Sequence, residues 1–487
     1  MKFRQYDQLQ TKFVNIDYRR TLGEDSDVVI LNNIIESLDF SKIEERYVEV
    51  GNPAYHPKEM IKILIYGYYK GYFGGRPLYR NYETDLGLRY LSNDDFPDYR
   101  TINLFRINFK EEIADIFAQV VMLCEGLGMV GFENLSVDSQ KIKANANLFQ
   151  NKNLKGIMRE KKRIETQLKK LLDDEIKFQQ NSDEIRKKKE KIERRKKKIE
   201  EAAQILKNAG KEEDKGVRYN ITDPDSRIMT DKRGVKNPDY NCQNAVDDKY
   251  QVLTAVKVTN VCNDDGELSP MKEKSKKITG RSHKNTIGDC GYSDKEKYKD
   301  MEKDKETEYY VPDRTMYSSK RNRYSKWSFR YEPERDVYIC PEGKDLVFVG
   351  QHKDVKGLEY RLYRGVNCKN CKVRDHCIKK VKKNVMERRY LINRSMVVYP
   401  EDELIKKMRE KLETDEGKNI YRSRMSTVEP VHGDMQKNRG FIQFVLRGLE
   451  KVNVEYNLLV IAHNIRKIII HAKDNLKKIM GKPINAI

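Results

Sequence analysis

The spacing of apolar residues changes near residue 131, and this change limits the fold more than any other feature of the sequence. Upstream, apolar residues recur at helical spacing from Met60 to Tyr69, shortly after Pro57, a residue tolerated in the first turn of a helix. Downstream, Leu135 and Val137 alternate with polar residues in the manner of a β-strand. We therefore expect an α/β protein with a helical N-terminal domain over residues 1 to 130.

The N-terminal domain should present basic and aromatic side chains on a bundle of helices. Arg100 and Arg106 accompany several tyrosines there, as a DNA-binding helical domain would require, although each tyrosine alone is better explained by packing. The pattern predicts helices at these places: from Pro57 to the glycines that begin at Gly71, over 77 to 91, over 99 to 108 and over 110 to 127.

Segments beyond residue 131 read as strands of one mixed sheet flanked by helices. The first segment, within 131 to 150, delivers Asp138, with Lys141 and Lys143 just after it. A strand that carries an aspartate and is followed by a three-stranded meander is typical of the opening of an RNase H-like core. Taken alone, an aspartate that ends a strand is usually part of a turn. The meander lies between 213 and 313, in segments separated by turn signals: 226 to 234, 240 to 247 and 250 to 260.

Residues 151 to 212 interrupt the sheet with two heptad patterns. Ile157 and Ile164 belong to the first pattern, Ile192 and Ile199 to the second, and a helix-capping sequence separates them. We expect an antiparallel coiled-coil hairpin. Its second arm, IRKKKEKIERRKKKIE, carries ten bases and three acids, which a solvated face explains at least as well as contact with DNA.

A second insertion, over 314 to 400, is rich in cysteine. CPEG supplies Cys340, and CKNCKVRDHC supplies Cys368, Cys371 and Cys377. Four thiolates are enough for a tetrahedral structural zinc site, so we predict Zn²⁺ here, with His376 as an alternative fourth ligand. The remaining four cysteines are scattered and are expected to pack in the interior.

Charge and hydropathy limit the partners. Lys and Arg number 97 against 76 Asp and Glu, a net charge of +21 that favours a polyanion such as nucleic acid, with a merely solubilising surface as the alternative. No apolar run is long enough for a membrane span, and the N-terminus lacks the core of a signal peptide. We expect a cytoplasmic protein without membrane contact.

Two further acids are candidates for chemistry. Asp289, in IGDCGYSDKEKY, lies just before a capping box; its nearest rival, Asp294, is better explained by the dipole at a helix start. Glu429, in YRSRMSTVEPVHGDMQKNRG, stands among cations that could grip phosphate, as in a metal-ion site acting on a nucleic-acid backbone. Yet Ser426 to Glu429 also form a capping box, and Pro430 favours a helix start there.

Several blocks resemble the DDE transposases of bacterial insertion sequences, in the IS4/IS5 superclass and most closely the IS1182 family. The resemblance covers the helical segment 53 to 109, SVDSQKIKANA around Asp138, GDCGYSD around Asp289 and the block around Glu429. These blocks stand in the family's order and span most of the chain. The resemblance implies an RNase H-like core completed by residues 401 to 487, which carry the glutamate helix and C-terminal helices.

The glutamate block matches the family in part. A tyrosine and an arginine precede the glutamate in the family, and Tyr421 and Arg424 match them. The family's lysine lies seven residues after the glutamate, where this chain has Gln436, followed by Lys437.

The resemblance implies the chemistry of the site. Asp138, Asp289 and Glu429 would hold two Mg²⁺ or Mn²⁺ ions, since clustered carboxylates repel one another unless cations neutralise them. The implied reaction is cleavage at terminal inverted repeats and strand transfer into target DNA by a homo-oligomer, at least a dimer. Phosphate contacts are expected from Arg424 and Lys437, and further DNA contacts from the residues matched or noted above: Tyr421, Lys141, Lys143, Arg100 and Arg106.

Two other hypotheses remain at this point. A decayed or repurposed transposase would bind DNA without cleaving it, and the displaced lysine at Lys437 is its best support. A scaffold built on the basic coiled coil is weaker, because it leaves the three acidic blocks unexplained.

Overall fold

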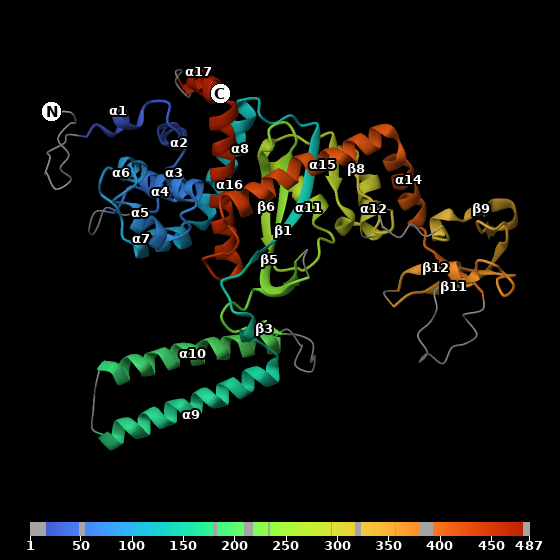
Figure 1. The fold of residues 1–487 in the computed structure, drawn as a ribbon, viewed down its shortest axis with the longest axis horizontal. Coiled ribbons are helices and arrows are strands. Elements are labelled where there is room, and N and C mark those ends of the chain that lie inside the picture. The colour runs from blue at the N-terminus through green and yellow to red at the C-terminus, as the bar shows by residue number, and fades with distance from the viewer. Residues whose placement is uncertain are drawn as a thin grey trace, which may run out of the picture.

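The structure is a computed structural model (Figure 1). It describes residues 16–47, 54–178, 183–208, 218–231, 234–293, 295–316, 323–355, 357–378 and 393–480. Asp294, the rival acid, lies outside these residues. Among them, no helix combines the length and the apolar character that a membrane crossing would require.

Short helices form the N-terminal part, as the spacing predicted. Helix α4 begins at Pro57, with His56 capping the amide of Lys58, and ends at Gly71, whose φ of 84° is left-handed. The single helix predicted over 77 to 91 is wrong, because Asp85 caps a new helix there, accepting from the amides of Gly87 and Leu88. The helices are α1 (Tyr18–Leu22), α2 (Asp27–Glu36), α3 (Ser41–Glu44), α4 (Pro57–Lys70), α5 (Gly75–Asn81), α6 (Leu86–Leu91), α7 (Tyr99–Asn108) and α8 (Lys110–Gly126).

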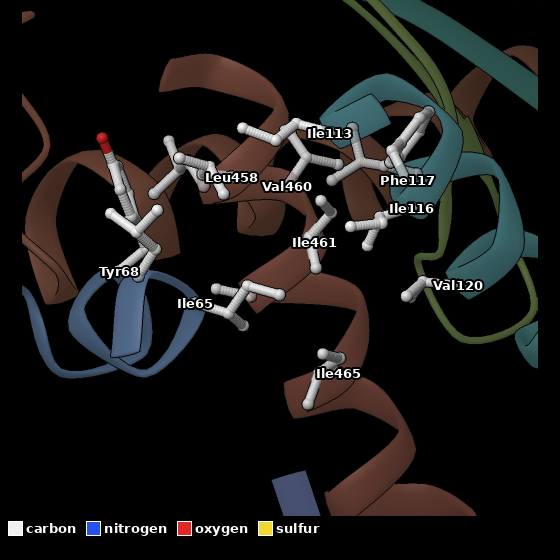
Figure 2. Close-up of a cluster of buried hydrophobic side chains, with 14 of the residues drawn as sticks. Ile65, Tyr68, Ile113, Ile116, Phe117, Val120, Leu458, Val460, Ile461 and Ile465 are labelled. Carbon is white, nitrogen blue, oxygen red and sulfur yellow. The ribbon is translucent and has the colours of Figure 1, made fainter. Parts of the chain in front are cut away.

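The C-terminal helix α16 (Leu449–His471) lies between the helical part and the sheet, followed by α17 (Lys473–Met480). Figure 2 shows Ile461 and Ile465 of α16 between α4, which contributes Ile65, and α8, which contributes Ile116. The same core includes strand residues such as Val256. Helix α16 is therefore buried on more than one face, and the two ends of the chain share one core.

A six-stranded mixed sheet forms the centre of the molecule. Its order is β4-β5-β1-β7-β8, with β6 also paired to β5. Strand β5 is antiparallel to β1, β4 and β6, whereas β7 is parallel to β1 and to β8. The strand predicted to carry Asp138 and the three predicted over 226 to 234, 240 to 247 and 250 to 260 are confirmed. The bounds of the six strands are β1 (Asn134–Lys143), β4 (Arg227–Thr230), β5 (Lys236–Asp247), β6 (Leu253–Thr259), β7 (Asn285–Gly288) and β8 (Glu308–Tyr310).

Helices cover both faces of this sheet. On one face, α11 (Leu268–Thr279) and α12 (Lys295–Lys303) pack with the side chains of Leu135 and Val137. On the other face lie α15 (Asp415–Gly433), the π-helix Asp434–Asn438 and α16, while α14 (Asp402–Glu413) leads into α15. Because side chains alternate along a strand, the face with α15 is the one that Asp138 and Gln140 occupy.

Two long helices, α9 (Leu154–Phe178) and α10 (Asp183–Asn208), project from the end of the sheet (Figure 1). They are antiparallel, since Glu160 pairs with Arg195 and Lys161 with Glu200. Ile157, Ile164 and Ile199 are buried between them, at the predicted heptad positions. The two-residue strands β2 (Asn151–Lys152) and β3 (Tyr219–Asn220) pair at the base of the hairpin.

A second sheet, which the sequence analysis did not predict, occupies the cysteine-rich insertion. It is antiparallel, in the order β13-β12-β11-β10-β9, and packs around Leu346, Tyr363 and Met396. Its strands are β9 (Arg330–Glu332), β10 (Val337–Ile339), β11 (Asp345–Lys353), β12 (Glu359–Gly365) and β13 (Ser395–Val398), and the short helix α13 (Arg374–Cys377) lies beside it.

Candidate active site

Asp138 lies in the middle of β1, the strand that β5 and β7 flank on its two edges. Only 9% of the residue is exposed. One carboxylate oxygen, Oδ1, accepts from the backbone N–H of Ser139 at 2.9 Å, and Oδ2 accepts from Nη1 of Arg424 at 2.9 Å. A guanidinium from α15 thus forms an ion pair with this buried carboxylate.

Asp289 follows β7, the strand parallel to β1. The register pairs Val137 with Gly288, so the next residues, Asp138 and Asp289, stand on neighbouring strands, which run about 4.8 Å apart. Burial raises the pKa of Asp289, and the negative charge of Asp138 raises it further. The two predicted aspartates therefore come together in one electrostatically coupled pair.

A third carboxylate, Asp264, lies beside Asp289 and was missed by the sequence analysis. Its Oδ1 accepts from Asn241 at 2.8 Å and from Gln243 at 2.6 Å. A Cβ on Gly291 would lie 2.8 Å from Oδ1 of Asp289 and 3.2 Å from Oδ2 of Asp264, so a larger residue there would displace the Asp289 carboxylate. The signal that could have found Asp264 is its position in NDDGE, directly after the strand pattern of β6.

Glu429 does not cap a helix start, so that alternative is wrong. Helix α15 begins fourteen residues earlier, at Asp415, where Thr414 caps it by accepting from the amide of Gly417 at 3.0 Å. Within this helix Val428 faces the core, whereas Glu429 is exposed. Helix α15 thus continues through Glu429 and Pro430, where the sequence had indicated a helix start.

Pro430 is tolerated inside α15 because its missing hydrogen bond is replaced. A proline at this position cannot donate to the carbonyl of Ser426, four residues earlier. That carbonyl accepts from Nε2 of Gln251 instead, at 2.9 Å. The π-helix from Asp434 to Asn438 follows at once.

The π-helix decides where the residues at the family's lysine position lie. Gln436 donates to Oε1 of Gln140 on β1 at 3.0 Å, and Gln140 donates to the hydroxyl of Tyr456 at 2.8 Å. Lys437, the next residue, is exposed. Gln436 is therefore part of a polar network against the sheet, and Lys437 is open to solvent.

The structure brings together part of the predicted set. Asp138, Asp289 and Arg424 meet, whereas Glu429 lies on the exposed face of α15. Within the described ranges, no group of three or more His, Cys, Asp or Glu residues is arranged to hold a metal ion. Tyr421, half-buried, stacks under the Arg424 guanidinium at 5.9 Å from its ring centre.

Comparisons with known families match both ends of the chain. Residues 339–469 match the model described as Transposase DDE domain, and residues 16–108 match the Transposase domain (DUF772). Both ends of the chain are therefore similar to transposase domains, the C-terminal one to a DDE domain. Neither the curated proteins nor the solved structures include a significant match. The DDE match includes Arg424 and Glu429, whereas Asp138 and Asp289 precede the matched residues. A DDE domain implies an enzyme of DNA phosphoryl transfer that depends on a divalent metal ion.

The two arginines that the sequence assigned to DNA have different surroundings in the structure. Arg100 is exposed at the start of α7. Arg106 is fully buried, and its guanidinium donates to the hydroxyl of Tyr68 at 2.9 Å and to Asn103 at 2.7 Å. The prediction that Arg106 contacts DNA is wrong for this structure, because its guanidinium is buried and donates its hydrogen bonds within the core.

The lysines after Asp138 lie on the opposite side of the sheet from it, since side chains alternate along β1. The ammonium of Lys141 donates to the carbonyl of Thr230 at 3.0 Å. Lys143, at the end of the strand, is exposed. Of these two, Lys143 is the better placed for DNA.

The four clustered cysteines line one small cavity beside β11. The backbone N–H of Lys344 donates to Sγ of Cys340 at 3.3 Å, and that of Arg394 donates to Sγ of Cys368 at 3.4 Å. Burial raises the pKa of Cys377, and the other three thiols raise it further. The set is convergent, although it is not arranged as a metal site in the described residues. His376 does not line this cavity.

Proposed function

We propose that this transposase binds the terminal inverted repeats of an insertion sequence in the bacterial cytoplasm, cleaves the DNA there and transfers the strand into target DNA. The observation that carries the proposal is the pair Asp138 and Asp289 on adjacent parallel strands, with Arg424 on Asp138. The strand order around β1, with one antiparallel neighbour and one parallel neighbour, supports an RNase H-like core.

The aspartate pair suits a divalent cation. Both ligands are carboxylate oxygens, the donors that Mg²⁺ and Mn²⁺ prefer. Burial and mutual repulsion raise the pKa of Asp289, and a bound cation would relieve both effects. When bound, the cations supply activation of the attacking oxygen and stabilisation of the leaving oxygen.

The chain's own residues have distinct roles in this proposal. Asp138 and Asp289 hold the cations at the sheet, and Glu429, exposed on α15, is the third carboxylate on the side open to DNA. Arg424 is the cation nearest the pair and would contact the phosphate beside the cut. Lys437, Tyr421 and Arg100 are proposed contacts further along the DNA, and the active form is an oligomer, at least a dimer.

A plasmid experiment tests the activity. Supercoiled plasmid carrying the gene's native flanks is incubated with wild type and with Asp289→Asn, in magnesium, in manganese and in EDTA. We expect nicking at the flanks by wild type only, and only with a cation. Binding of the flanks without nicking under every condition would contradict the proposal and identify a DNA-binding protein that has lost catalysis.

We also propose that Cys340, Cys368, Cys371 and Cys377 hold a structural zinc ion. The support is their shared cavity and the backbone N–H groups directed at two sulfurs, which stabilise thiolates. Metal analysis of purified protein should find about one zinc per chain. Protein without zinc, with all four thiols freely titratable, would contradict this assignment.

A further inference from the structure

A basic groove lies between the helical hairpin and the end of β1. Its volume is about 910 Å³, and no aspartate or glutamate lines it. We call it the hairpin groove. Its charged lining residues are all cations: Lys143, Lys191, Arg194, Arg195, Lys198 and Arg447.

One wall is a stripe on α10. Lys191, Arg194, Arg195 and Lys198 are spaced three, four and seven residues from the first, which places them on one helix face. All four are exposed. Ile199 and its neighbours on another face pack against α9, so packing of the hairpin does not require the basic stripe.

Part of the charge on this wall is uncompensated. Arg195 pairs with Glu160 at 2.5 Å, and Arg194 approaches Glu190 at 3.4 Å. Among the residues that the structure describes, Lys191 and Lys198 have no ion pair within 4.0 Å. Although α10 carries basic residues on other faces as well, the cations of this stripe face those of a second wall across the groove.

The second wall belongs to the catalytic core and is well held. Arg447 donates through Nε to the carbonyl of Asn145 at 2.8 Å and through Nη2 to its Oδ1 at 3.1 Å. The backbone N–H of Lys143 donates to the carbonyl of Ile442 at 3.3 Å, and the backbone N–H of Phe444 donates to the carbonyl of Lys143 at 2.8 Å. Lys143 follows Asp138 by five residues on β1, which is about 17 Å along the strand at roughly 3.4 Å per residue, and its side chain leaves the opposite face of the sheet.

We propose that the hairpin groove binds the phosphate backbone of duplex DNA next to the cleaved position. Cations on both walls without a lining carboxylate complement a polyanion, and a distance of about 17 Å is roughly five base-pair steps of about 3.4 Å. This inference rests on the proposed function, because it places the DNA relative to Asp138. It assigns the inserted hairpin to DNA binding rather than to a solvated surface.

The test compares two double variants of α10. Lys191→Gln with Lys198→Gln removes two charges from the groove, and Lys189→Gln with Lys197→Gln removes two charges from other faces of the same helix. Binding of a fluorescein-labelled duplex carrying one end of the element is followed by anisotropy in EDTA, from roughly 50 to 200 mM salt. Cleavage in magnesium is measured separately.

We expect the groove variant to bind about tenfold more weakly, and the slope of log Kd against log salt to fall by about 1.8, or 0.9 for each lost phosphate contact. The control variant should bind like wild type, and circular dichroism should show both folded. Equal binding by the two variants, or no duplex binding by wild type, would overturn the inference. Absence of cleavage by wild type, with the binding difference intact, would contradict the proposed function alone.

Discussion

The two aspartates and the glutamate of the candidate site are held in different ways. Asp138 lies on β1, Asp289 directly follows the adjacent parallel strand β7, and a guanidinium already pairs with Asp138. Glu429 belongs to a helix that covers the sheet, and it lies on the exposed side of that helix. The sheet thus positions the two aspartates without any contribution from DNA, whereas Glu429 faces the side from which DNA would approach.

The difference lies in how much stability each carboxylate costs the folded protein. A buried carboxylate costs stability unless a charge or hydrogen bonds compensate it. Arg424 supplies that compensation for Asp138, and the raised pKa of Asp289 shows that its compensation is incomplete. Glu429 remains hydrated and carries no such cost.

The largest effect of a substitution should be the loss of cleavage when the buried Asp138 is replaced. Asp138→Asn keeps the shape but removes the charge that Arg424 and a cation would share, so single-turnover cleavage should fall by at least about 10³-fold, or roughly 4 kcal/mol. Duplex binding should change little. Asp239→Asn, on the adjacent strand β5, is the matched control and should cleave like wild type; equal losses in the two variants would show that burial, not chemistry, makes Asp138 important.

The free energy of unfolding should likewise depend on the buried arginine of α7, Arg106, and hardly on the exposed one, Arg100. Arg106→Leu removes the cation that lowers the pKa of buried Glu455, whose pKa burial raises, so the free energy of unfolding should fall by about 3 kcal/mol. Arg100→Leu, at an exposed position, should change it by less than about 0.5 kcal/mol. Denaturant titrations measure both values. Similar stability of the two variants would contradict the structural role of Arg106.

A smaller effect should appear at Asp239, a buried sheet carboxylate outside the site. Burial raises its pKa to about 6, and Oδ1 has no hydrogen-bond partner among the described residues. Because the folded state binds this proton more tightly than the unfolded state, wild-type stability falls as the pH rises from about 4 to 6. Asp239→Asn should be more stable by about 2 kcal/mol at pH 7, and the gain should vanish below about pH 4. A gain independent of pH would contradict this account.

The sequence predicted those parts of the fold that local patterns determine. Pro57 and Gly71 mark the ends of α4, and alternation marks the strands that carry or follow Asp138. Asp289 could be chosen only by resemblance, since its strand β7 is four residues long and its position depends on pairing with β1.

Other features depend on contacts between distant parts of the chain, which local patterns do not record. Pro430 lies within a helix because Gln251, far away in sequence, satisfies the carbonyl that proline leaves open. Arg106 is buried because Tyr68 and Asn103 accept hydrogen bonds from its guanidinium and the buried Glu455 lies near its charge. The second sheet has short strands with mixed exposure, so its sequence lacks a clear alternating signal.

The most direct test of the central claim is single-turnover cleavage of a duplex carrying one element end by Glu429→Gln and by Glu416→Gln, another exposed glutamate of α15. If Glu429 completes the site formed by Asp138 and Asp289, the first variant should cleave at least about 10²-fold more slowly than wild type in magnesium, while binding the duplex normally. The second variant should retain the wild-type rate. Wild-type cleavage by both variants would contradict the assignment of Glu429 and leave the aspartate pair without its proposed partner.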